Sequence, residues 1–237
     1  MILCSLDFET TGTEPLRDEP TEFGGVLYST KQHRCLDSLG VLLKTEVPIS
    51  SEITEKTGIT KQALNRFGYV PSEILPTIVE MIESADAVIG YNCRRFDQKV
   101  LIEWAKRENV EIPNKPWIDL YYDLPYNVPV GKLSHVMADH GFLNYFPHSA
   151  LSDAMGVLLI ASKYDSNLLL QRSQSPTVII RSLVDRSQND LVKQAKFRWN
   201  PSFKIWWKAV KEQDIEEFTK SLPFKTELSN LTQEELE

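Results

Sequence analysis

Two carboxylates, Asp7 and Glu9, stand at the end of an otherwise apolar segment, Ile2–Leu6. Side chains alternate between the two faces of a strand, so residues two apart point the same way, with Cα atoms about 7 Å apart. Two anions at the mouth of a buried strand repel each other and resist desolvation, and a divalent cation commonly compensates them. The pair therefore indicates a metal site. Solvation of a strand end is the alternative, because acidic pairs of this spacing also arise by chance among 33 acidic residues.

Two more acidic residues and a histidine occur where apolar elements meet polar segments. Asp97 follows the short apolar run Ala87–Gly90 and opens a predicted helix, where ordinary compensation of the helix dipole is an alternative role. Asp153 lies in the first turns of a predicted helix built otherwise from apolar residues, which makes this carboxylate the more informative of the two. His148 stands in the loop just before that helix, and a packed or solvated loop histidine is its alternative interpretation.

The order of these motifs resembles the DEDDh branch of the DnaQ-like 3′-5′ exonucleases. The matching stretches are DFETTG from Asp7, TGIT from Thr57, NCRRFD from Asn92 and HSALSD from His148. The resemblance covers about residues 1–164 and implies a ribonuclease-H-like sheet with a two-metal site that hydrolyses the terminal phosphodiester at a 3′ end. Thr57 is a departure, since family members often have histidine there.

The resemblance also implies a role for each matching residue. By motif position, the metal carboxylates are Asp7, Glu9, Asp97 and Asp153. Four hard oxygen ligands suit Mg²⁺ or Mn²⁺, with two ions in each active site. His148 corresponds to the general base, and an imidazole with a pKa near 6.5 suits the removal of a proton from water near neutral pH. The positions that neighbour the substrate in the family are Thr10, Thr11, Asn92 and Phe8, although alternation along the strand turns Phe8 into the core.

The elements that would position these residues follow from hydrophobic periodicity. Strands are predicted for the first apolar segment and for residues 23–28, 35–43, 87–90 and 117–120. Helices are predicted to start near Ser51 and Thr60, to cover residues 71–83, to follow Asp97, and to cover residues 133–140 and 149–164. Three strands followed by helices alternating with two more strands predict an α/β fold, a mixed five-stranded sheet flanked by helices.

The cysteines and the apolar runs indicate a compartment. Cys4, Cys35 and Cys93 are odd in number and far apart, so we expect reduced thiols in or near the core, without disulfides or structural zinc. The apolar runs are too short to span a membrane, and no cationic leader opens the chain. A cytoplasmic protein without a membrane partner is the expectation.

Charge is distributed unevenly along the chain. Residues 1–171 hold 15 basic and 23 acidic groups, residues 172–211 hold 9 and 2, and residues 212–237 hold 2 and 8. The domain prediction has four parts: an exonuclease domain at 1–165, a linker at 166–177, a small basic and aromatic α+β module at 178–225, and an acidic, frayed tail at 226–237.

The predicted module interleaves aromatic residues with cations on a predicted hairpin at residues 197–209. In one interpretation the cations bind phosphates and exposed rings stack on bases. In the other, the aromatic residues form the core of a small module and the charges only face solvent. The expected phosphate contacts are Arg181, Lys193, Lys196, Arg198, Lys204 and Lys208.

The sequence thus predicts a two-metal-dependent 3′-to-5′ exonuclease that releases nucleoside 5′-monophosphates. Its expected partner is a nucleic-acid 3′ end, with DNA favoured over RNA, and protein partners are left open. An RNA 3′-end trimming exoribonuclease is the first alternative, and a noncatalytic nucleic-acid-binding platform is the second. An acyl-transfer hydrolase is disfavoured because no Gly-x-Ser-x-Gly elbow occurs.

Overall fold

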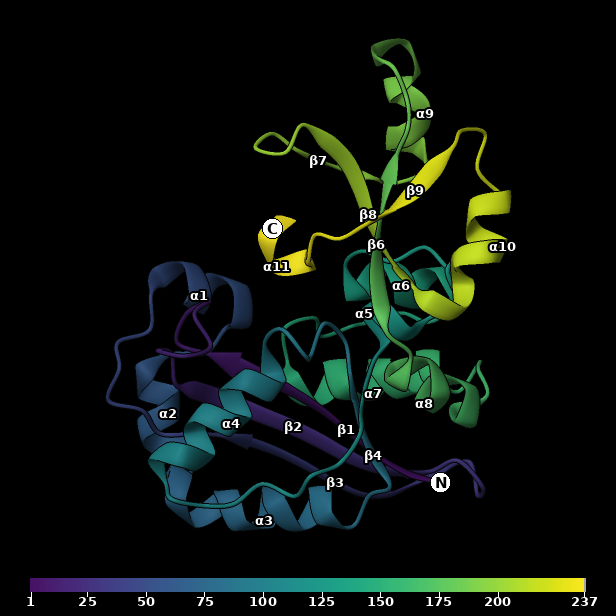
Figure 1. Ribbon diagram of the computed structural model, residues 1–237. Coiled ribbons are helices and arrows are strands. Elements are labelled where there is room, and N and C mark those ends of the chain that lie inside the picture. The colour runs from purple at the N-terminus through teal and green to yellow at the C-terminus, as the bar shows by residue number, and fades with distance from the viewer. Residues whose placement is uncertain (237) are drawn as a thin grey trace. The chain divides into compact units, whose positions relative to one another are not determined.

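The computed structural model describes residues 1–236, which form two compact units. The first unit holds Met1–Leu124 and Pro129–Ser173, and the second holds Pro125–Val128 and the chain from Gln174 onward (Figure 1). Among the described residues, no helix has the length and apolar character needed to cross a membrane.

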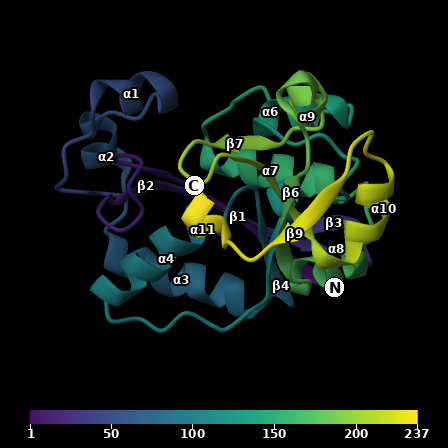
Figure 2. The same ribbon diagram turned by 45° about the horizontal axis from the view of Figure 1, so that its top comes forward.

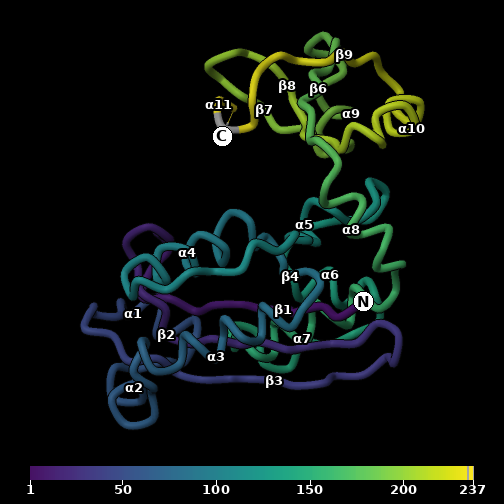
Figure 3. The backbone as a smooth tube through the Cα atoms, turned by 60° about the horizontal axis from the view of Figure 1, so that its bottom comes forward, coloured from purple at the N-terminus to yellow at the C-terminus, as the bar shows by residue number. Residues whose placement is uncertain are grey.

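The first unit is built on a five-stranded sheet with the order β3-β2-β1-β4-β5. Its strands are β1 Ile2–Thr10, β2 Pro20–Ser29, β3 Arg34–Leu42, β4 Ala87–Gly90 and β5 Trp117–Asp119. Strands β1, β2 and β3 pair antiparallel and run as long neighbours in Figure 3, whereas β4 pairs parallel with both β1 and β5. The predicted mixed five-stranded sheet is confirmed. Leu120, predicted to belong to the last strand, instead begins a helix.

Helices cover both faces of this sheet. They are α1 Ser51–Thr57, α2 Lys61–Phe67, α3 Pro71–Glu83, α4 Asp97–Arg107, α5 Leu120–Asp123, α6 Leu133–Asp139, α7 Ala150–Ala161 and α8 Ser166–Gln174. Cys4, Leu6 and Phe8 of β1 point into the core that α3 and α4 close. The opposite face meets α7 (Figure 2). There the Ser5 hydroxyl donates to the carbonyl of Ala154 at 2.8 Å.

The second unit contains a four-stranded antiparallel sheet with the order β7-β8-β6-β9. Its strands are β6 Thr177–Ser182, β7 Arg198–Asn200, β8 Ile205–Lys211 and β9 Thr226–Ser229. Its helices are α9 Asn189–Gln194, α10 Ile215–Lys220 and α11 Gln233–Leu236, with short 3₁₀ turns at Arg186–Gln188 and Glu212–Asp214. The core of this unit contains Ile180, Val192, Phe197, Val210 and Phe218.

Three further expectations differ from the structure. The expected linker at 166–177 is largely helix α8, because Leu169 and Arg172 are buried there. The expected frayed tail instead supplies β9 to the sheet, and Leu236 is buried. Cys4 and Cys93 are buried free thiols as expected, but Cys35 is exposed, since it lies on the edge strand β3.

Candidate active site

Asp7 and Glu9 lie at an end of the sheet where β1 is longer than its parallel neighbour. Strand β1 pairs with β4 only as far as Ser5, opposite Ile89, so its last residues have no strand on that side. On the other side Glu9 lies opposite Glu22 of β2. Because even-numbered residues of β1 enter the core under α3 and α4, Asp7 and Glu9 point to the face that carries α7.

Asp97 closes the open edge of β1 from the first turn of α4. Its Oδ1 accepts a hydrogen bond from the backbone amide of Phe8 at 2.9 Å, and the residue is only 4% exposed. An acidic residue in the first turn also faces the positive end of the helix dipole. The carboxylate is thereby held beside the strand segment that carries Asp7 and Glu9.

The start of α7 is fixed against β2 by backbone proximity. A Cβ atom at Gly24 would lie 2.1 Å from the backbone of Ala150 and Leu151, so the strand and the helix meet where a side chain has no room. Glu22 adds two contacts, accepting from the Ala150 amide at 3.2 Å and from the Ser149 hydroxyl at 3.3 Å. These contacts set the position of Asp153 one turn further along α7.

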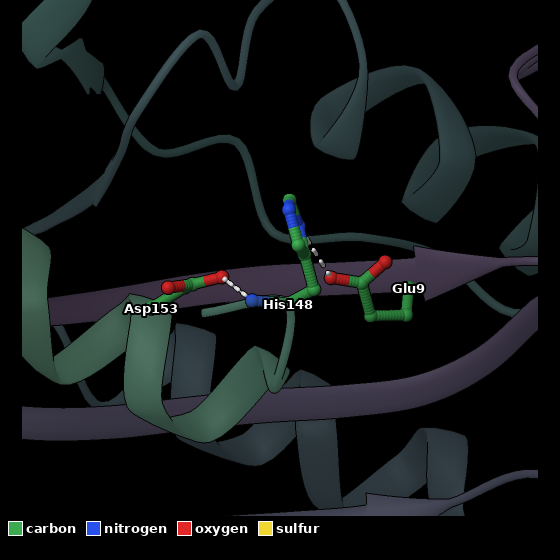
Figure 4. A group of neighbouring side chains, drawn as sticks. All are labelled: Glu9, His148 and Asp153. Carbon is green, nitrogen blue, oxygen red and sulfur yellow. Dashed lines mark hydrogen bonds and ion pairs between the residues drawn. The ribbon is translucent and has the colours of Figure 1, made fainter. Parts of the chain in front are cut away.

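Asp153 and His148 are tied to each other. The backbone amide of His148 donates to Oδ2 of Asp153 at 2.9 Å, and the Asn144 side-chain amide donates to Oδ1. The φ angle of His148 is +63°, a left-handed conformation that is uncommon outside glycine. That turn places the imidazole between the two carboxylates in Figure 4, with Nδ1 3.9 Å from Oε1 of Glu9.

One cluster of potential metal ligands results. Ligand atoms of Glu9, His148 and Asp153 lie within 4.8 Å of one another. The His148 side chain is 43% exposed, against 13% for that of Glu9, so solvent reaches the imidazole while the carboxylate is largely enclosed. Asp7 and Asp97 are near enough to each other to influence each other's protonation.

The electrostatics show an excess of negative charge. Burial raises the pKa of Asp7 well above its usual range, and the neighbouring Asp97, Asp153 and Glu9 raise it further. Burial is also the main cause that raises the pKa of Asp97 to about 8 and that of Glu9 to about 7. Lys56 partly offsets the effect on Glu9. A carboxylate cluster of this kind favours ionisation only when cations bind beside it.

The pKa of His148 is shifted in the opposite direction, downward. Burial lowers its pKa below the ordinary 6.5, and Lys56 and Lys132 act in the same direction, although Asp153 opposes them. The imidazole is therefore neutral at pH 7 and can accept a proton.

The predicted substrate neighbours are placed in different ways. Thr10 and Thr11 are buried, with hydroxyls that donate to the carbonyl of Gly12 at 2.5 Å and to Oδ1 of Asp18 at 3.0 Å. Phe8 is a core residue that contacts the rings of Phe23 and Trp104, so its side chain turns away from the carboxylates, as alternation predicts. For Phe8, only the backbone lies at the site.

Asn92 is held by a network around β5. Its φ angle is +57°, and its backbone amide donates to Oδ1 of the fully buried Asp119 at 2.7 Å. Arg94 forms a bidentate pair with Asp123 at 3.1 and 2.6 Å. These hydrogen bonds hold the segment between β4 and α4 against Asp119 and Asp123. They thereby also fix the position of Asp97, where α4 begins.

Two residues near the carboxylates were missed in the sequence. Glu22 is an acidic residue within an otherwise apolar strand, the same signal that singled out Asp7, and burial raises its pKa. Asn144 contacts Asp153 through its side chain, and nothing in the local sequence marks that contact.

The cations expected to bind phosphates have varied surroundings in the second unit. Arg181 forms an ion pair with Glu227, and Lys193 lies 3.6 Å from Asp190. Lys208 departs from the expectation, because its ammonium donates to the Ala195 carbonyl at 3.0 Å and lies over the Phe218 ring. Lys208 is half-buried, and desolvation lowers its pKa.

The aromatic residues of the hairpin divide between core and surface. Trp207 is 3% exposed, whereas Trp199 and Phe203 are 48% and 45% exposed. Arg198 lies over the Trp207 ring, and Lys196 and Lys204 both adopt left-handed backbone angles. Some rings of the hairpin therefore form the core and others face solvent, and contact of the exposed rings with bases stays a prediction.

The amino-acid sequence is similar to those of known exonuclease domains. A model of the exonuclease family RNase_T matches residues 4–160. PolC-type DNA polymerase III of Thermotoga maritima is 34% identical over 114 residues, which are 48% of this chain and 8% of that protein. The corresponding protein of Caldanaerobacter subterraneus is 30% identical over 108 residues, 46% of this chain and 7% of that protein. The match thus spans less than a tenth of the length of these relatives.

Solved structures of similar fold extend the comparison. A structure of exonuclease I superposes with a TM-score of 0.65 at 15% identity, covering 92% of this chain and 67% of that chain. Escherichia coli exonuclease I in complex with a 5cy-dT13 oligonucleotide gives a TM-score of 0.63 at 17% identity, covering 88% of this chain and 51% of that chain. A 3′-exonuclease that recognises the histone mRNA stem-loop gives 0.55 at 20% identity, covering 68% and 80%. At these identities the likeness is one of fold.

Proposed function

This chain belongs to the RNase_T exonuclease family of DnaQ-like 3′-5′ exonucleases, and from that premise we propose that it removes nucleoside 5′-monophosphates from DNA 3′ ends with two divalent ions. One observation carries the proposal. Asp7, Glu9, Asp97 and Asp153 come from three separate elements and surround the open end of β1, with His148 beside them.

The donor set fits divalent cations. All four carboxylates have raised pKa values, and burial is the largest cause for each of them. Hard oxygen donors in this number suit Mg²⁺ or Mn²⁺, which is the proposed cofactor. When bound, the ions would supply charge stabilisation for the phosphoryl oxygens and lower the pKa of a bound water.

His148 is the proposed general base. Its neutral imidazole accepts a proton as a water oxygen attacks the terminal phosphorus, and the bond from phosphorus to the 3′ oxygen of the preceding nucleotide breaks. The released nucleotide keeps its 5′ phosphate, and the 3′ oxygen of the shortened strand takes a proton from solvent to become a new 3′ hydroxyl. Solvent exposure of the imidazole allows the proton to leave the site afterwards.

The terminal nucleotide would lie against the turn after β1. Thr10 and Thr11 direct their hydroxyls into this turn, so their contribution to substrate binding would come from the backbone. Asn92 borders the same end of the sheet from the far side of β4. These residues are the proposed substrate neighbours.

DNA is the favoured substrate because the curated relatives are DNA polymerases and an exonuclease I structure holds a DNA oligonucleotide. An RNA 3′ end is the second candidate, supported by the fold of the exonuclease that recognises a histone mRNA. Digestion of DNA and RNA strands of identical sequence with Mg²⁺ separates the two. We expect at least tenfold faster release from DNA, and faster release from RNA would overturn this preference.

Lysines of the second unit would contact phosphates of the nucleic acid. Lys196 and Lys204 carry no ion pair among the described residues. Each lysine that contacts a phosphate adds roughly one released counterion to binding. A Lys196→Gln/Lys204→Gln variant should therefore weaken binding and reduce the salt dependence of Kd. Lys220→Gln, which removes a charge paired with Glu216, is the matched control, and an unchanged salt slope in the double variant would contradict the contact.

A further inference from the structure

The loop between α6 and α7 exposes an unusual amount of apolar surface. Leu143 is 68% exposed, Tyr145 is 77% exposed and Phe146 is 71% exposed. Large exposed apolar groups that gather in one place are typical of a binding surface. Residues 141–147 contain no charged side chain, so the loop offers nothing to neutralise a phosphate.

The loop is anchored through Asn144. The side-chain oxygen of Asn144 accepts from the Ser152 hydroxyl at 3.0 Å and from the Phe146 amide at 3.1 Å. The side-chain amide of the same residue donates to Asp153. Two of these hydrogen bonds connect the loop to the first turn of α7 and the third lies within the loop, so the backbone that carries the two aromatic rings has a fixed support.

The same hydrogen bonds place the aromatic pair at the edge of the carboxylate cluster. Phe146 precedes His148 by two residues, and its carbonyl accepts from the Ser149 amide at 3.3 Å. His148 and Asp153 both belong to the ligand cluster. A nucleic-acid strand whose 3′ end reached Glu9 would bring its terminal bases next to the loop between α6 and α7.

We propose that Tyr145 and Phe146 form a stacking surface for unpaired bases next to the 3′ end, which makes single-stranded ends the substrate class. This inference rests on the proposed function. Aromatic rings stack on any base because every base has a π face, and no charge is needed for that contact. Bases within a duplex already have both faces covered by their neighbours, so only unpaired or frayed ends can use the surface.

Binding without catalysis provides the test. The Kd of a labelled oligothymidylate is measured in EDTA for the wild type and for Tyr145→Ala/Phe146→Ala, with a second oligonucleotide that lacks the last three bases but keeps the sugars and phosphates. We expect the double variant to bind the intact strand about tenfold more weakly. We expect both proteins to bind the abasic strand equally, within about twofold.

Two further variants complete the design. Tyr145→Trp/Phe146→Trp keeps the aromatic surface and should bind the intact strand like the wild type. Leu36→Ala removes an exposed apolar side chain from β3 near the opposite end of the sheet, and should change neither Kd. Thermal unfolding of each variant confirms that it is folded.

Each contrary outcome is decisive. An unchanged Kd in the double variant would overturn the stacking role and favour an apolar protein surface as the occupant of the loop. A tenfold loss that persists on the abasic strand would also overturn it, because the rings would then not contact bases. If base-dependent binding is found but Mg²⁺ releases no nucleotide, the stacking surface stands and the proposed function fails.

Discussion

Oδ1 of Asp97 accepts a hydrogen bond from the backbone amide of Phe8 at 2.9 Å, between the two acidic residues of β1. The carboxylate thus has two functions at once: it satisfies an amide that no neighbouring strand reaches, and it adds a charge to a crowded cluster. Substitution can separate the two functions, because an asparagine oxygen can accept the same hydrogen bond without the charge.

Asp97→Asn should stabilise the protein in the absence of metal. Removing one of several repelling buried carboxylates should raise the free energy of unfolding by about 1 kcal/mol at pH 8, while exonuclease activity falls at least about a thousandfold. Denaturant unfolding in EDTA measures the first effect. Asp37→Asn, at an exposed position on β3, is the control with little effect. A destabilised Asp97→Asn protein would show that the hydrogen bond requires the carboxylate.

Metal-free stability should fall as pH rises. The carboxyl pKa values of Asp97 and Glu9 are raised from 3.8 and 4.5 to about 8 and about 7, so the folded state binds more protons than the unfolded state between these limits. This contribution to stability is fully present below about pH 4, under the unfolded-state pKa values of the two groups, and is lost as the pH rises toward 8. Thermal unfolding in EDTA from pH 5 to 8.5 should show a falling Tm. Added Mg²⁺ should raise the Tm, and the increase should be largest at the alkaline end of this range. A Tm that rises with pH in EDTA would contradict the cluster.

His148→Ala should impair chemistry and spare binding. Loss of a general base commonly costs about 10²- to 10⁴-fold in rate, so kcat should fall by at least about a hundredfold with Kd for a DNA strand unchanged. Because the pKa of His148 is lowered, the acid limb of the wild-type kcat profile should have its midpoint below 6.5. His135→Ala, an exposed histidine on α6, is the matched control. A variant that lost only binding would exclude the general-base role.

Gly24→Ala should disturb the site from a distance along β2. The new Cβ would meet the backbone of Ala150 and Leu151 at 2.1 Å, and neither backbone group can move without shifting α7. We expect a loss of about 1 to 3 kcal/mol in stability and a fall in kcat as Asp153 moves. Gly131→Ala, which has no atom within 4 Å of its added Cβ, should change stability by less than about 0.5 kcal/mol. Equal effects of the two substitutions would refute the close approach.

Features that depend on local periodicity and on the order of motifs could be predicted from the sequence. The apolar spacing of residues 71–83 predicted α3 with its observed bounds, Pro71–Glu83. The predicted metal carboxylates lie at the ends of β1, α4 and α7, and their role as metal ligands stays a prediction. Helix α8 was missed because its buried Arg172 depends on the carbonyls of Asp123 and Leu124, about fifty positions earlier. Long-range contacts of this kind leave no local pattern.

Other misses have the same origin. The acidic tail was expected to be frayed from its composition, yet β9 completes a sheet edge by pairing with β6. Lys208 was expected to face phosphate because it alternates with aromatic residues, but it lies opposite Ile180 and its ammonium reaches the Ala195 carbonyl. In both cases the partner segment determined the outcome, and only the fold brings that partner near.

The most direct test of the central claim is digestion of a 5′-labelled single-stranded oligodeoxynucleotide with Mg²⁺, with wild type and Asp7→Ala compared at equal concentration. The wild type should shorten the labelled strand stepwise from its 3′ end and release nucleoside 5′-monophosphates. Asp7→Ala should remain folded and act at least about a thousandfold more slowly, a loss of about 4 kcal/mol in transition-state stabilisation. Near-normal release by folded Asp7→Ala, or no release by the wild type with either Mg²⁺ or Mn²⁺, would contradict the claim.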